Sequence, residues 1–285
     1  MTNAHSFHIP VMGIGFTVDT PVKVAHLGIS SVISLVDDML VEKMREFYCR
    51  EFGLPFQAIS DKIDDFRAKR ITAYLNLVNE LVKKRFDELK ESINHTGGEL
   101  ERYIHLLPDL SEIKIRFQQF LHQHNLKELQ IWIHNHLPVG SIDVNIMTKL
   151  DRETYRDGEK LPTEYNDAHA ALRGFAKSDL ESSVVLSAGM NPKLYSYIEN
   201  FDDFYPDAHG YIRKKIILKV SDYRSALIQG KFLAKKGIWI SEYRIESGLN
   251  CGGHAFATDG YLMGPILEEF KNNRQELIET THKML

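Results

Sequence analysis

The sequence has little cysteine, no long apolar run and no large excess of either charge. Its 285 residues include only two cysteines, Cys49 and Cys251. Two cysteines cannot form the disulfide framework of a small secreted domain, and the count indicates a reducing compartment. No apolar stretch approaches the roughly 18–20 residues that a membrane-spanning helix needs. The formal net charge of -4 gives no electrostatic reason to expect a nucleic-acid partner.

The N-terminal residues "MTNAHSFHIP" also lack a basic region followed by an apolar run, so they do not resemble a secretory signal. Hydrophobic residues make up 43% of the chain, which is enough for a sizeable core. The length fits one large domain or two small ones. We therefore expect a soluble cytoplasmic protein.

Six short apolar or β-branched runs are predicted to be strands. Several are separated by segments with helical periodicity, and none is joined to the next by a tight hairpin signal. The polar region around "RDGEKLPTEYND" (156–167) is predicted to be a long loop. This alternation predicts a parallel α/β sheet, open or closed, whose ligands bind where the strands end. The predicted strands are 9–16, 29–36, 141–147, 182–189, 214–222 and 238–248.

Helices are predicted between and after these strands. Pro21 suits the first turn of a short helix capped by Thr20, and Gly28 suits its end. Residues 37–135 carry apolar side chains at helical spacing and no β-branched run, which predicts a helical insertion. A final helix starts near Pro265, and its predicted core-facing residues are Ile266, Leu267, Phe270 and Leu277.

The string "GLNCGGHAF" (248–256) follows the last predicted strand and gathers three glycines around His254. Glycine is costly in regular structure because it has the most backbone freedom to lose. One interpretation is a simple turn. The other is that the backbone closely approaches a ligand there, with the histidine directed at it.

Several strings, taken in order, resemble an FMN-dependent family that includes the nitronate monooxygenases (2-nitropropane dioxygenases) and bacterial enoyl-ACP reductase II. The family fold is an aldolase-type (β/α)8 TIM barrel. The resemblance covers about 1–36 and 140–265. The strings that carry it are "IPVMG" with "TPVKVAHLGISSVISL", "VNIM" (144–147), "SAGMNPKLY" (187–195), "KKIILKVSD" (214–222) and "ESGLNCGGH" (246–254).

The resemblance implies an FMN site at the carboxyl ends of the strands. His254 matches a family histidine that acts as a base near the flavin or lies close to the reacting groups. Histidine suits the role of a base because its unperturbed pKa is near neutrality. The resemblance also implies a set of cofactor-binding positions in this sequence: Met12, Gly13, Asn145, Lys219, Ser247, Gly252 and Gly253.

The sequence also departs from the family. Ser247, Asn250 and Cys251 stand where the family has glutamine, glutamate and alanine or serine. Only six of the eight β/α units are recognisable, so we expect 1–36 and 136–285 to form a partial barrel. An additional C-terminal segment or a partner chain would complete it. Because phosphate contacts supply much of a nucleotide's binding, we expect the chain alone to bind FMN weakly or not at all.

Two chemistries stay open: oxidation of a nitronate-like small molecule, and hydride transfer to an enoyl thioester, with NAD(P)H as a transient reductant. A metal site is not expected from His122, His124, His134 and His136, because residues two apart do not share a helix face. The alternative to an enzyme is a non-catalytic partial barrel, one lobe of a larger assembly that docks through its helical insertion.

A pair of substitutions separates chemistry from cofactor binding in a flavin-loaded form of the protein. We expect His254→Ala to lower kcat by about 10²–10⁴-fold, the usual cost of losing a general base, with flavin content nearly unchanged. Gly252→Val should instead empty the flavin site, because the valine side chain adds bulk where the backbone must approach the flavin closely. Flavin absorbance and kcat are measured on each variant, and wild-type turnover in His254→Ala would make this histidine structural.

Overall fold

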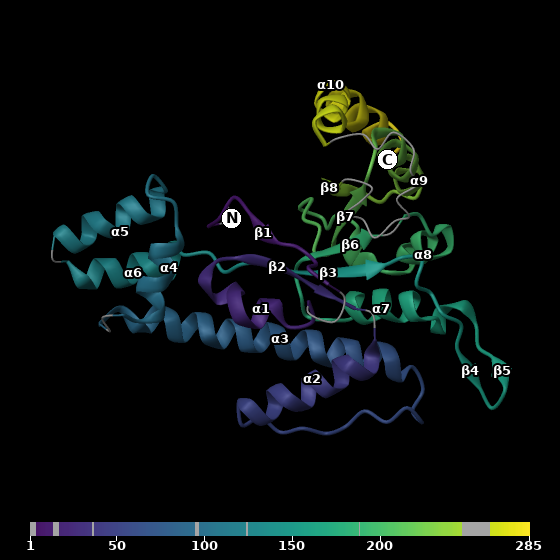
Figure 1. Cartoon of the computed structure of the whole chain (residues 1–285), viewed down its shortest axis with the longest axis horizontal. Coiled ribbons are helices and arrows are strands. Elements are labelled where there is room, and N and C mark those ends of the chain that lie inside the picture. Colours follow the sequence, from purple (N-terminus) through teal and green to yellow (C-terminus); the bar gives the residue numbers. More distant parts are fainter. Residues whose placement is uncertain are drawn as a thin grey trace. The chain divides into compact units, whose positions relative to one another are not determined.

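The computed structural model describes residues 4–13, 17–35, 37–94, 97–123, 125–187, 189–246 and 263–285 (Figure 1). The chain divides into two packed units. The first comprises Met1–Ile33 and Tyr74–Asp143, and the second comprises Ser34–Ala73 and Val144–Leu285. Each unit is described within itself. No helix of the described residues is long and apolar enough to cross a membrane.

The fold is α/β, with a curled six-stranded parallel sheet whose strands follow one another in sequence order, β1-β2-β3-β6-β7-β8. The six predicted strands and their parallel arrangement are thereby confirmed. The first is much shorter than predicted, because Pro10 follows it and cannot donate to the ladder. The strands are β1 (His8–Ile9), β2 (Ser30–Ser34), β3 (Ile142–Met147), β6 (Ser183–Ser187), β7 (Lys215–Val220) and β8 (Ile240–Ile245).

The first unit is mostly helical outside its strands. Thr20 is the first residue of α1 rather than its cap, which is Asp19, while Pro21 stands in the first turn as predicted. A 3-10 turn, Ala25–Leu27, ends at Gly28 with φ 77°, a left-handed conformation that favours glycine. The helices of this unit are α1 (Thr20–Val24), α4 (Glu99–Leu106), α5 (Glu112–His122), α6 (Leu126–His136) and the later part of α3 (Phe66–Glu91), with a 3-10 turn at Ser92–Asn94.

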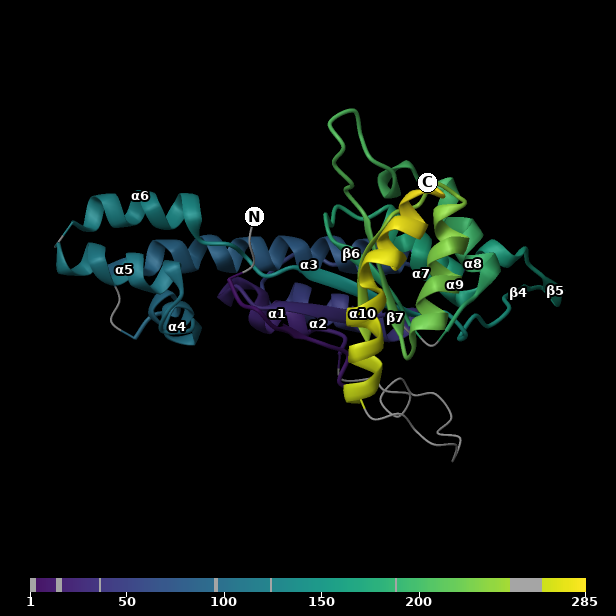
Figure 2. The same ribbon diagram turned by 90° about the horizontal axis from the view of Figure 1, so that it is seen from above.

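Helices α4, α5 and α6 lie side by side in this unit (Figures 1 and 2). Their shared core is a cluster of buried aromatic and aliphatic side chains, with Tyr103 at its centre. The Tyr103 hydroxyl donates to the Pro138 carbonyl at 2.8 Å. Its ring covers Gly28 so closely that a Cβ there would lie 2.8 Å from it. The described residues of 37–135 form helices and connections, with no strand.

The second unit carries helices on the apolar side of the sheet. Tyr243 in β8 reaches α9 at Gly230, where an added Cβ would lie 2.5 Å from the tyrosine oxygen. Helices α9 and α10 lie side by side there (Figures 1 and 2). The helices of this unit are α2 (Asp38–Glu51), the start of α3, α7 (Asp167–Ala176), α8 (Pro192–Tyr197), α9 (Tyr223–Ala234) and α10 (Met263–His282), with 3-10 turns at Thr163–Tyr165, Ile198–Asn200 and Asp202–Phe204.

Two predictions for this unit were wrong. The predicted loop contains an antiparallel hairpin, β4 (Tyr155–Arg156) and β5 (Glu159–Lys160). Asp157 and Gly158 between them have φ 52° and 84°. Positive φ at both central residues defines a two-residue hairpin turn, and the dipeptide Asp-Gly is a strong sequence signal for that turn. The other error is Leu267, which is 47% exposed although the remainder of its predicted face on α10 is buried.

Lys214, just before β7, is completely buried without a carboxylate partner in hydrogen-bonding contact. Its ammonium donates to the carbonyls of Phe175, Ser178 and Leu180 at 3.0, 2.8 and 2.5 Å. These carbonyls lie at and beyond the end of α7, where the last helical oxygens lack intrahelical partners. A cation is favourable at this negative end of a helix dipole. Burial nevertheless lowers the pKa of Lys214 to about 8.

We expect Lys214→Met to destabilise the protein by roughly 3 kcal/mol at pH 7, since it removes the lysine donor from the Ser178 and Leu180 carbonyls. The folded-state pKa of about 8 lies below the usual 10.5, so between these values the unfolded chain holds a proton that the folded chain has released. Wild-type stability therefore gains a component that rises with pH through this window.

Urea unfolding at several pH values from 7 to 10.5 measures both effects. The exposed neighbour Lys215 provides the control, Lys215→Met, which should keep the wild-type pH dependence. An unchanged pH dependence in Lys214→Met would contradict the account of Lys214.

Candidate functional site

The two faces of the sheet in the second unit differ sharply in character. Side chains alternate between faces along a strand. On one face the register aligns Val144, Val184 and Ile216, which are all buried and apolar. Tyr243, which contacts α9, belongs to this apolar face through its pairing with Leu218. The other face, named here the polar face, carries Asn145, Val185, Ser187, Ile217 and Lys219. Its three polar residues, Asn145, Ser187 and Lys219, lie in the second half of their strands.

Asn145 is the polar residue most deeply placed on the polar face, with 2% of its surface exposed. Its amide nitrogen donates to the Ser34 hydroxyl at 3.2 Å. Its side-chain oxygen Oδ1 is buried and accepts no hydrogen bond from any described residue. A buried polar atom without a partner costs free energy, so it indicates either a ligand or an ordered water. Asn145 therefore offers an acceptor near the carboxyl ends of the strands.

Lys219 follows on the same face near the end of β7. Its ammonium lies 2.6 Å from the Glu246 carboxylate, and its side chain is 14% exposed. Glu246 comes directly after β8, so the pair connects the carboxyl ends of the last two described strands. An anionic ligand group at this edge would compete with Glu246 for the lysine. The polar face thus supplies one free acceptor and one ion-paired cation.

The other predicted cofactor positions are placed differently. Met12 and Gly13 belong to the first unit and lie in the connection after β1. Met12 is 77% exposed, and its backbone amide donates to the Thr17 hydroxyl at 2.9 Å. Thr17 in turn donates both its amide and its hydroxyl to the Gly13 carbonyl. Met12 and Gly13 are therefore not within a strand as predicted, because β1 ends at Ile9.

The remaining predicted site residues lie outside the described residues. They are Ser247, Gly252, Gly253 and His254.

Asn191 and Tyr195, from the "SAGMNPKLY" string, make hydrogen bonds within the fold. Asn191 caps α8 by accepting from the Leu194 amide at 3.2 Å, and its amide nitrogen donates to the Thr148 carbonyl at 2.8 Å. Tyr195 is fully buried and donates to the Gln229 side chain at 2.6 Å. Burial raises the pKa of the Tyr195 hydroxyl. Their side chains are thus committed to internal hydrogen bonds.

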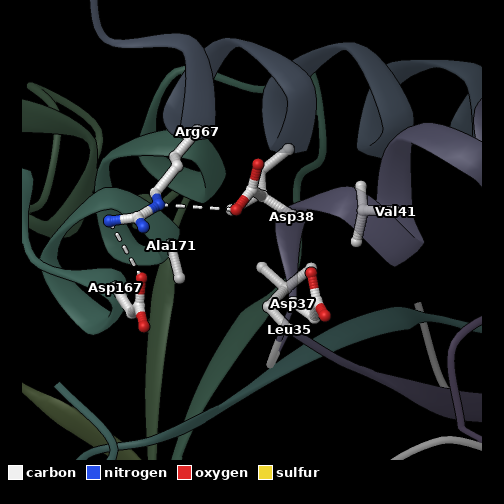
Figure 3. A pocket seen from close by; sticks show the side chains of 8 residues that line it. Leu35, Asp37, Asp38, Val41, Arg67, Asp167 and Ala171 are labelled. Carbon is white, nitrogen blue, oxygen red and sulfur yellow. Dashed lines mark ion pairs between the residues drawn. The ribbon is translucent and has the colours of Figure 1, made fainter. Parts of the chain in front are cut away.

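A charged cluster that the sequence analysis missed lies at the start of three helices (Figure 3). Arg67 near the start of α3 is 3.4 Å from Asp38, the first residue of α2, and 3.1 Å from Asp167, the first residue of α7. Arg70 pairs with Asp38 at 2.7 Å. Burial raises the pKa of Asp167, against the opposing effect of Arg67. Carboxylates at helix N-termini are favourable for the dipole.

The pocket beside this cluster, lined also by Asp37 and Leu35, has room for about one water molecule. Asp37 caps α2 by accepting from the Met39 amide at 2.8 Å. The cluster therefore holds helix starts together and leaves no space for a substrate. The sequence does carry a signal for this helix start, because two consecutive aspartates follow a predicted strand and aspartate is a preferred N-cap residue.

A second missed pair is Asp151 with His169, whose Oδ2 and Nδ1 atoms lie 2.9 Å apart. Burial opposes ionisation of Asp151, but the nearby His169 ring and the hydrogen bond from the Ala168 amide outweigh it and lower the pKa of Asp151. The His169 ring is buried against Tyr197, with ring centroids 5.2 Å apart. An imidazole enclosed in this way cannot reach a substrate, so the pair orients the start of α7.

Within the described ranges, no three histidine, cysteine, aspartate or glutamate side chains gather as a metal site would require. In comparisons with known proteins, no family model matches the chain, and no curated protein or solved structure shows significant similarity to it.

The unpaired oxygen of Asn145 predicts an unusual stability pattern. The double variant Asn145→Leu with Ser34→Ala should be as stable as wild type or about 1 kcal/mol more stable, because both partners of one hydrogen bond and the unpaired oxygen are removed together. Ser34→Ala alone should cost about 1–2 kcal/mol, since it leaves the Asn145 amide without its acceptor. Urea unfolding of the three proteins tests this. A double variant less stable than Ser34→Ala would show that the Asn145 oxygen is satisfied in the folded protein.

Proposed function

We propose that the protein is an FMN-dependent oxidoreductase whose flavin binds at the polar face, at the carboxyl ends of β3, β6 and β7. The observation that carries the proposal is the buried, unpaired Oδ1 of Asn145 on the polar face. The setting supports it, because a curled parallel sheet with strands in sequence order is compatible with part of a (β/α)8 barrel. In barrels of that kind, ligands bind where the strands end.

The residues present fit a flavin in two respects. The isoalloxazine ring has an N–H donor, and the Asn145 oxygen is an acceptor that needs one. A reduced flavin gathers negative charge, and Lys219 is a cation on the same face. Because Glu246 already holds the Lys219 ammonium at 2.6 Å, the lysine side chain is oriented before any ligand arrives.

A bound flavin supplies hydride or single-electron transfer, chemistry that side chains cannot provide. The resemblance assigns the base to His254 and the close backbone approach to Gly252 and Gly253. The substrate is then a nitronate-like small molecule or an enoyl thioester, with NAD(P)H as reductant in the second case. Asn191 and Tyr195 are committed to the fold and favour neither chemistry.

A non-catalytic role is the second candidate, and the edge of the sheet favours it. Within the described residues β8 pairs with β7 and with no other strand. An unpaired edge of a parallel sheet presents backbone donors and acceptors that another chain can use. The protein would then be one lobe of an assembly and would be colourless.

A flavin titration distinguishes the two roles. The sequence favours weak FMN binding or none, and the unpaired Asn145 oxygen and the Lys219 cation on the polar face now favour weak binding. We therefore expect saturable quenching of FMN fluorescence with a dissociation constant of roughly 10–100 µM, weak because the described strands provide few phosphate contacts. Lys219→Met and Asn145→Leu should each weaken binding about 5–10-fold, the loss expected for one hydrogen bond or one screened charge. Lys215→Met, on the same strand but exposed at its amino end, is the control. No saturable binding, or equal affinity in all four proteins, would overturn the flavin proposal.

A further inference from the structure

A groove of about 440 Å³ runs between the edge strand β8 and helix α10 in the second unit. Both elements are labelled in Figure 1. The volume is within the range of small-molecule sites, which are concave and mostly apolar with a few polar groups. Its walls are mainly apolar and include Trp239, Ile240, Ile245, Leu267, Phe270 and Ile278.

Helix α10 presents two stripes of residues. One stripe, including Ile266, Phe270 and Leu277, is buried. The second stripe is spaced at 4, 3 and 4 residues and consists of Leu267, Lys271, Arg274 and Ile278, all of which line the groove. Leu267 and Ile278 are 47% and 43% exposed. The groove is therefore an apolar channel with two cations midway along one wall.

The charges of the groove are unbalanced. Glu242 on the opposite wall is occupied by Arg244, whose Nε lies 2.6 Å from its carboxylate. Lys271 makes two long contacts, 3.3 and 3.4 Å, to the carboxylate oxygens of the exposed Glu268. Arg274 makes no hydrogen bond or ion pair with any residue in the described part of the chain. Its guanidinium can take a carboxylate through two parallel hydrogen bonds.

From these observations we infer that the β8–α10 groove binds a single-chain anionic amphiphile, with its aliphatic chain along the apolar walls and its carboxylate at Arg274 and Lys271. The long stems of the two cations extend the apolar wall while their charges stay at its rim. This site is separate from the polar face, because it lies along the edge strand rather than at Asn145. The inference does not depend on the proposed flavin, and its test needs none.

Trp239 in the groove wall provides the signal. The chain has two tryptophans, and the other, Trp132, lies in α6 of the first unit. In a Trp132→Phe background, dodecanoate below its micellar concentration should give a saturable change in Trp239 emission, with a dissociation constant on the order of 10 µM. Arg274→Gln should weaken binding at least tenfold, and Ile278→Asp should abolish it. Both positions are exposed, and circular dichroism confirms that the variants fold.

The matched control is Arg224→Gln, an exposed arginine on the neighbouring α9 that does not line the groove. It should bind dodecanoate with wild-type affinity. Dodecyl phosphate should bind like dodecanoate, and dodecanol at least tenfold more weakly. Equal binding of dodecanol, or no effect of Arg274→Gln, would overturn recognition of an anion.

Two further outcomes would also overturn the inference. One is binding to vesicles of phosphatidylglycerol without any binding of monomeric dodecanoate, which would indicate a membrane surface. The other is self-association in sedimentation experiments that Ile278→Asp abolishes, without dodecanoate binding. That result would make the groove an interface between copies of the chain.

Discussion

The parallel hydrogen-bond ladder joining β3, β6 and β7 is the interaction on which the second unit depends. It aligns Val144 with Val184 and Val184 with Ile216, and thereby gathers the apolar side chains on one face. Parallel strands also require connections that return to the starting edge, and helices provide them. The helices cover the apolar face, and all strands end at the same edge. The contrast between the two faces follows from this single pattern.

Two buried polar residues toward opposite ends of the strands, Lys214 and Asn145, differ in how their polar atoms are paired. Lys214, at the amino end of β7, is surrounded by carbonyls from the end of α7, and its role is fully explained by them. Asn145, nearer the carboxyl end, has one of its two polar atoms unpaired. Folding alone does not account for an acceptor left without a donor, since it lowers stability. This difference is the reason for proposing a functional site at the carboxyl ends of the strands.

The edge of the sheet imposes a second constraint. Helix α10 packs beside α9. Within the described residues, no strand lies beyond β8 against which the rest of its apolar surface could pack. One stripe of α10 is buried in this way, and Leu267 and Ile278 remain beyond it. In the part of the chain that the structure describes, β8 is the edge of the sheet, and the groove lies between this strand and α10. Arg274 gives this apolar surface a charge preference that the strand edge alone lacks.

The sequence by itself determined the six strands, their parallel order and the helical character of 37–135, because these depend on local periodicity and on turn residues such as Pro21 and Gly28. It also contained the Asp157–Gly158 hairpin signal, which was obscured by the polar residues around it. For the site, it placed Asn145 and Lys219 on strands but could not reveal that one oxygen of Asn145 lacks a partner or that Glu246 holds Lys219. The tertiary structure decided those points, together with the Arg67 cluster and the exposure of Leu267. Periodicity specifies which side of an element is apolar, whereas only packing specifies which neighbouring element meets that side.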